Sequence, residues 1–188
     1  MRKRSLISVL LGVVVALGGG FVHARSETAS QHKSATSSAP EFTSAVLEKI
    51  QEIEGKTVAI AQDFPDDLYT TYRPKGNEDV RTAAEILLHI AEQNQSAAEL
   101  IRTKQQAEAL IAAGKRPSAK NILTFVSKQD TVAKVKESFA AVREAIQENP
   151  DPKNAQWWLY VIAHSNGHFG NLVTYYRNNG LVPPTSRQ

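Results

Sequence analysis

Cysteine is absent from the sequence. The chain therefore forms no disulfide, and it has no thiolate with which to attack a substrate or bind a metal. Its stability must come from a packed core or a bound ion, and a metal site must be built from His, Asp, Glu or water. A convincing alternation of apolar and polar residues, which would indicate strands, is also missing. We therefore expect an all-α fold.

Acidic residues are missing from the first 24 positions. Three basic residues, 2–4, precede an uncharged apolar run over residues 5–20, and small or modest residues lead up to Ala24. This order is typical of a secretory signal peptide that is cleaved after Ala24. The alternative is a retained membrane anchor, which needs about 20 apolar residues. The run is shorter and ends in three glycines, so we expect export to the periplasm or cell exterior, with no stable membrane anchor after cleavage.

The remainder of the chain has no net charge, because residues 1–24 hold three of the 22 basic residues and none of the 19 acidic ones. A protein that binds nucleic acid needs a persistent basic surface to neutralise phosphates. We therefore expect a small-molecule substrate or ligand as the partner, and no nucleic acid. The sequence leaves the oligomeric state open, with a homodimer as one candidate.

Large apolar residues are also missing from residues 25–39, which are rich in Ser, Thr and Ala. Such a segment cannot bury enough surface to offset the entropy of ordering it, so a flexible, disordered linker is predicted. In the remaining domain, residues 40–188, apolar residues recur every three or four positions in four segments, as in amphipathic helices. These segments cover residues 41–62, residues 79–114 with a bend or break near 102–106, the stretch from Ser127 to Asn149, and residues 154–177. The pattern predicts a four-helix bundle.

Three of the five histidines, His89, His164 and His168, fall within predicted helices. His164 and His168 are four residues apart and project from one helix face, so both imidazoles can reach one metal ion. His89 supplies a third ligand if its helix faces theirs. The alternative is that each histidine is a hydrogen-bonded core residue. Ser165 stands where an HExxH motif has its glutamate, which removes the general base of a metalloprotease.

Several neighbours of these histidines are candidates for supporting roles. Glu85 and Gln93 lie one turn either side of His89 and could orient a ligand or bind metal-held water, with solvated helix positions as the alternative. Tyr175 lies near the histidine face and could line a pocket. Gly167 and Gly170 each cost about 1 kcal/mol in a helix interior. They indicate either tight helix packing or close approach of a ligand.

Two longer motifs contain the histidines. The first is YRPKGNEDVRTAAEILLHIAEQN, and the second is HSNGHFGNLVTYYRNNGLVPP. Together with the intervening SKQDTVAKVKESFAAVREAI, they make residues 66–186, approximately, resemble the DinB-like (YfiT/DinB) family. The resemblance implies a four-helix bundle in which one histidine of the second helix and two of the fourth bind a divalent metal. Here those positions are His89, His164 and His168.

The resemblance also bears on activity. Three protein ligands leave an open coordination position, as expected of a catalytic metal. Some relatives transfer low-molecular-weight thiols onto electrophiles. Others carry a glutamate immediately before the last histidine, where this chain has Gly167. Imidazole ligands suit Zn, Ni and Fe, so the identity of the ion stays open. The leading hypothesis is a metal-dependent hydrolase or thiol-transferase, and the alternative is a non-catalytic bundle that binds a metal or small ligand.

Overall fold

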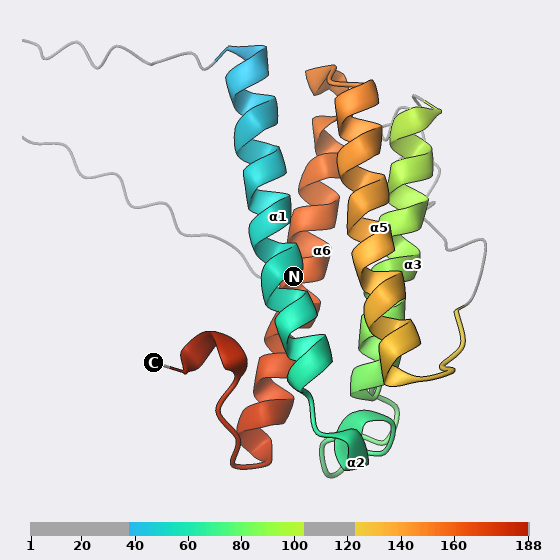
Figure 1. Cartoon of the computed structure of the whole chain (residues 1–188), viewed down its shortest axis with the longest axis vertical. Helices are drawn as coiled ribbons and strands as arrows, with labels where there is room; N and C mark the ends of the chain where they lie inside the picture. The colour runs from blue at the N-terminus through green and yellow to red at the C-terminus, as the bar shows by residue number, and fades with distance from the viewer. Residues whose placement is uncertain (1–37, 104–122, 188) are drawn as a thin grey trace, which may run out of the picture. The chain divides into compact units, whose positions relative to one another are not determined.

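A computed structural model describes residues 38–103 and 123–187. Four long helices dominate these residues (Figure 1), namely α1 (Ala39–Asp63), α3 (Ala83–Arg102), α5 (Lys128–Glu148) and α6 (Ala155–Asn178). The short helices are α2 (Asp66–Tyr69), η1 (Pro152–Asn154) and η2 (Pro184–Ser186). No strand occurs in the two described ranges, so the all-α prediction is confirmed for them. The predicted signal peptide, most of the predicted linker and residues 104–114 of the second predicted helix lie outside the described residues.

Hydroxyl side chains cap three of the long helices and decide where they begin. The Ser38 hydroxyl accepts the N–H of Glu41, whose carboxylate accepts the N–H of Ser38 at 2.8 Å. Thr82 and Glu85 form the same reciprocal capping box at the start of α3. The first box places the start of α1 within the last two residues of the predicted linker. The second starts α3 four residues later than the sequence pattern indicated.

The four long helices pack in a ring, because α1 and α3 each contact both α5 and α6. In Figure 1, α1 and α6 run in one direction and α3 and α5 in the other. Phe42 stacks on Trp158 near the N-terminal ends of α1 and α6, with ring centroids 6.1 Å apart. At the C-terminal ends of α3 and α5, the Arg102 guanidinium donates a hydrogen bond to the Glu148 carboxylate at 3.2 Å. The neighbouring helices α3 and α5 are therefore parallel, unlike neighbours in an up-down bundle with short loops.

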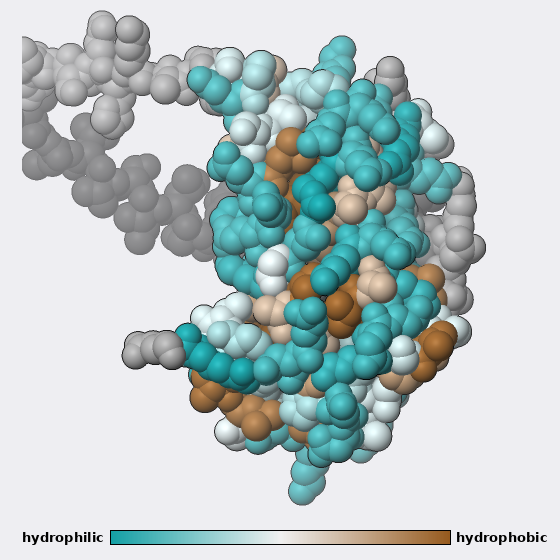
Figure 2. Space-filling view, in the orientation of Figure 1, coloured by the Kyte–Doolittle hydropathy of each residue, from teal (hydrophilic) through white to brown (hydrophobic). Residues whose placement is uncertain are grey.

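The apolar face of each long helix points into this ring. The largest fully buried side chains come from all four helices and from the turn after α1; they include Trp158, Tyr176, Phe64, Phe139, Ile50, Leu87 and Ile146. The side of the domain seen in Figure 2 is mostly hydrophilic, with brown patches near its centre, at its lower left and at its right edge. None of the described helices is both long and apolar enough to span a bilayer.

A buried polar layer crosses the core beside the histidines. Asn94 of α3 is fully buried, donates to the Ser138 hydroxyl of α5 at 3.3 Å, and accepts from the Ser165 hydroxyl of α6 at 3.3 Å. Because each partner lies on a different helix, these bonds fix the heights of α3, α5 and α6 relative to one another. His89 lies five residues before Asn94 on α3, and His164 directly precedes Ser165 on α6. The hydrogen bond between Asn94 and Ser165 therefore places the two histidines opposite each other.

Candidate metal centre

The three helical histidines converge between α3 and α6. His89, His164 and His168 each offer a ring nitrogen, and these nitrogens all lie within 4.8 Å of one another. The Nε2 atoms of His89 and His164 are 3.2 Å apart. The ring centroid of His168 lies 5.0 Å from that of His89 and 4.6 Å from that of His164. The sequence pattern could pair only the two histidines of α6, whereas the fold brings His89 to them.

The spacing of these nitrogens fits a divalent ion. Two imidazole nitrogens bound at 2.0–2.1 Å to a tetrahedral ion lie roughly 3.3 Å apart. The 3.2 Å separation of the His89 and His164 Nε2 atoms matches this value. The ligand nitrogens of all three histidines lie within 4.8 Å of one another, so small movements of the half-buried rings would bring the third nitrogen to the same spacing. The three residues can therefore hold a metal.

Protonation also suits metal binding. Burial, reinforced by the charges of the neighbouring histidines and Arg81, lowers the pKa of His164 to about 3. Burial with the charges of His89 and Arg81 lowers the pKa of His168 to about 4. The pKa of His89 is also lowered, first by burial and then by Arg81. At neutral pH all three imidazoles are uncharged, which is the form that binds metals.

The remaining ring nitrogens differ in their surroundings. His89 Nδ1 lies 3.7 Å from a carboxylate oxygen of Glu92, just beyond hydrogen-bonding distance. His168 Nδ1 lies 3.4 Å from the side-chain amide of Asn171. His164 Nδ1 is buried and has no hydrogen-bond partner among the described residues. A buried polar atom without a partner costs about 1–3 kcal/mol, so this arrangement does not serve stability.

Glu92 was not singled out from the sequence, although it lies three residues after His89 and hence on the same side of α3. Its side chain is only 12 % exposed. One carboxylate oxygen accepts the backbone N–H of Leu123 at 2.6 Å, and the other faces His89. A carboxylate that accepts the Nδ1 proton of a histidine leaves Nε2 free to bind a metal. Glu92 is thus placed to orient His89.

An open cavity of about 1270 Å³ adjoins the cluster. Its walls come from the residues leading into α3, from α3 itself, from residues 123–125 and from α6. His89 and His168 line it, whereas His164 lies behind them and does not. A small molecule in the cavity could therefore reach two of the three histidines.

The three supporting residues proposed from the sequence occupy different positions. Tyr175 lines the cavity, and its hydroxyl donates to the Arg81 carbonyl at 2.7 Å. Glu85 also lines the cavity, but its carboxylate is engaged by Thr82 and by Arg73 at 3.0 Å. Gln93 accepts a hydrogen bond from the Tyr160 hydroxyl at 2.9 Å. Tyr160 in turn stacks on His164, with ring centroids 5.4 Å apart.

Tight packing against another described helix, one interpretation of Gly167 and Gly170, is wrong, and close approach of a ligand stays a prediction. A Cβ added at either position meets no atom within 4 Å, and both residues are exposed. Neither another helix nor a described wall of the site approaches them, so nothing in the structure explains glycine at these positions.

Comparison of the chain with protein-family models, curated proteins and solved structures gives no match. What the chain shows by itself is a helical bundle with a cluster of three histidines that could hold a metal.

Proposed function

We propose that the protein is a divalent-metal-dependent enzyme of the DinB-like type, with His89, His164 and His168 as the metal ligands. The observation that carries this proposal is the convergence of three uncharged imidazoles at the wall of an open cavity. The order and spacing of the two histidine motifs in the sequence support the family assignment. Gly167, where some relatives have a glutamate, departs from the family pattern and removes one acid/base group.

A purely structural role for the histidines agrees poorly with their contacts. Histidines buried for stability have partners for their ring nitrogens, because an unpaired buried nitrogen costs free energy. Here the close contact is between two ring nitrogens of His89 and His164, and His164 Nδ1 lacks a described partner. Convergent lone pairs at this spacing are what a cation requires.

The access from the cavity favours catalysis over simple metal storage. A divalent ion bound by these residues supplies Lewis-acid chemistry and lowers the pKa of a water or thiol that reaches it. His89 and His168 line the cavity, and a carboxylate oxygen of Glu92 lies 3.7 Å from His89 Nδ1, on the side opposite the nitrogen that would bind the ion. This arrangement suits hydrolysis or the transfer of a thiol to an electrophile. The alternative is a non-catalytic bundle that binds a metal or small ligand at the same histidines.

Export is part of the proposal and rests on residues 1–24 alone. An exported enzyme meets few of the low-molecular-weight thiols that act as cytosolic reductants, which favours hydrolysis of a small molecule over thiol transfer. Sequencing the N-terminus of the protein from its native host tests this point. A chain that begins near Arg25 is expected, and a cytoplasmic product with Met1 intact contradicts export.

Elemental analysis of protein purified without chelators from the native host tests the metal. We expect about one equivalent of a divalent transition metal per chain, and its loss in His89→Ala with the helical circular dichroism retained. A screen of ester and thiol-acceptor substrates with the loaded protein then separates the two reaction types. A protein that carries no metal and takes up neither Zn, Ni nor Fe contradicts the proposal.

A further inference from the structure

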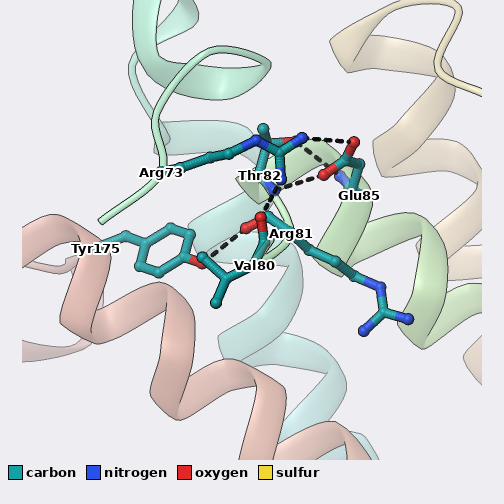
Figure 3. A network of polar contacts seen from close by, with 6 residues as sticks. All are labelled: Arg73, Val80, Arg81, Thr82, Glu85 and Tyr175. Atoms are coloured by element: carbon teal, nitrogen blue, oxygen red, sulfur yellow. Dashed lines mark hydrogen bonds and ion pairs between the residues drawn. The ribbon is translucent and has the colours of Figure 1, made fainter. Parts of the chain in front are cut away.

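Hydrogen bonds hold the backbone just before α3 at three consecutive residues, 80–82 (Figure 3). The Arg73 guanidinium donates to the carbonyl of Val80. The N–H of Thr82 donates to the Glu85 carboxylate at 2.7 Å, and Arg73 also pairs with that carboxylate. These bonds fix the residues on either side of Arg81.

Arg81 itself is held through its backbone, while its side chain stays free. The Tyr175 hydroxyl of α6 donates to the Arg81 carbonyl at 2.7 Å. In Figure 3 the Arg81 side chain extends away from Arg73, Glu85 and Tyr175. No hydrogen bond or ion pair joins its guanidinium to another residue of the described ranges. The fold thus holds this residue at an anchored position without using its charge.

The free guanidinium belongs to the same cavity as the histidine cluster. Arg81, His89 and His168 all line that cavity. A fixed cation beside a divalent metal raises the energy of the loaded site, because like charges repel. An anion that contacts both would remove this penalty.

We infer that Arg81 binds the anionic group, a carboxylate or a phosphate, of a small-molecule substrate whose reacting part lies at the histidine cluster. The planar guanidinium suits both groups because it can donate two parallel hydrogen bonds to their oxygens. This inference rests on the proposed function and names its substrate class. Carboxylates also line the cavity and repel an anion, namely those of Glu78, Asp79, Glu85 and Glu92, so Arg81 is the group without a described ion pair that would attract one.

The test uses the protein loaded with Co²⁺, whose visible absorption responds to ligands that approach the ion. The loaded protein is titrated with inorganic phosphate and with acetate at constant ionic strength. Arg81→Gln should weaken binding of the anions about tenfold or more, as expected for a lost hydrogen bond between charged groups. Arg81→Lys keeps the charge but loses the planar guanidinium. Its affinity for the anions should lie between those of the wild type and Arg81→Gln. Lys75→Gln is the matched control, since Lys75 is an exposed cation of the same loop that does not line the cavity.

The outcomes separate this inference from the proposed function. Cobalt binding with equal anion affinities in wild type and Arg81→Gln overturns the role of Arg81 and leaves the metal site standing. Failure of the wild type to bind cobalt contradicts the metal site. In that case, the metal-free protein is titrated with the same anions while NMR follows the Arg81 side chain. This titration tests whether Arg81 binds an anion. A signal that does not respond to either anion overturns the inference, and a saturable response that Lys75→Gln retains supports it.

Discussion

Two polar clusters lie close together on α3 and α6 and differ in how their polar atoms are satisfied. In the first, Asn94 bonds to hydroxyls of Ser138 and Ser165, and Ser138 donates further to the carbonyl of Val135 at 2.8 Å. In the second, His89 and His164 bring two ring nitrogens together, and His164 Nδ1 has no described partner. The first cluster joins three helices by hydrogen bonds, whereas the second leaves one buried ring nitrogen without a described partner.

This difference separates a structural cluster from a functional one. A fully bonded buried network stabilises one arrangement of the helices. A buried ring nitrogen without a partner, such as His164 Nδ1, costs stability, and such costs are typical of sites that are arranged for function. The histidine cluster also adjoins a cavity, and Asn94, Ser138 and Ser165 do not line it. We therefore expect substitutions in the two clusters to have opposite consequences for stability and for metal affinity.

The largest effect on stability is expected from Asn94→Ala. The change removes both interhelical hydrogen bonds, strands the Ser165 hydroxyl and leaves a cavity, so the free energy of unfolding should fall by about 2–4 kcal/mol. Urea denaturation measures it. Metal affinity, measured by competition with a chelator under conditions where the variant is folded, should change far less. A loss of stability below about 1 kcal/mol would show that the layer is not structural.

His164→Leu should have the opposite pattern, with a large loss of metal affinity and no loss of stability. It deletes a proposed ligand, and metal affinity should fall by more than the roughly 10–100-fold that is typical of losing a residue that hydrogen-bonds to a ligand. The metal-free variant should be more stable than the wild type by about 1 kcal/mol, because an apolar side chain replaces an unpaired buried nitrogen. Chelator competition and urea denaturation of metal-free samples measure the two quantities. A strongly destabilised variant that still binds metal tightly would assign His164 to the core instead.

The pH dependence of stability should also separate the clusters. The pKa of His164, about 3, and of His168, about 4, lie below the value of about 6.5 in an unfolded chain. The unfolded chain therefore binds more protons between these values, and the metal-free protein should lose stability as pH falls from about 6.5 toward 4. His164→Leu lacks one of these groups and should lose less stability between about pH 7 and pH 5. Equal losses in variant and wild type would show that His164 is not held uncharged.

A smaller effect on metal affinity is expected from Glu92→Gln. Glu92 faces His89 Nδ1 at 3.7 Å, and replacing its carboxylate with an amide should weaken metal binding about tenfold. The fraction of His89 with its proton on Nδ1, measured by nitrogen NMR, should fall in parallel. Glu85→Gln is the control, because it makes the same change about two turns earlier on α3, and a capping box tolerates glutamine. Equal losses of affinity in both variants would remove the special role of Glu92.

The helices and the histidine pair of α6 were predictable from the sequence because they depend on local periodicity. The apolar positions of α1 and the spacing of His164 and His168 suffice for them. The capping boxes at Ser38 and Thr82 were also readable, since each hydroxyl residue precedes a glutamate by three positions. Asn94 left a weaker signal, as a polar residue within an apolar stripe.

Other features depend on how whole helices pair, which a single sequence does not encode locally. The parallel pairing of α3 with α5 is one of these. The choice between Glu85 and Glu92 is another, because both lie within one turn of His89 and the distant Arg73 helps to hold the Glu85 carboxylate away from the ring. The free guanidinium of Arg81 is a third, since it follows from bonds made by Arg73 and Tyr175 at distant positions.

X-ray absorption spectroscopy of the protein loaded with one equivalent of Zn²⁺ tests the central claim most directly. The site at His89, His164 and His168 predicts three imidazole nitrogens at 2.0–2.1 Å from the ion, completed by a light-atom ligand from solvent. The imidazole scattering should drop in His89→Ala. A shell made only of oxygens, or a wild-type spectrum that His89→Ala leaves unchanged, would contradict the assignment of the metal site.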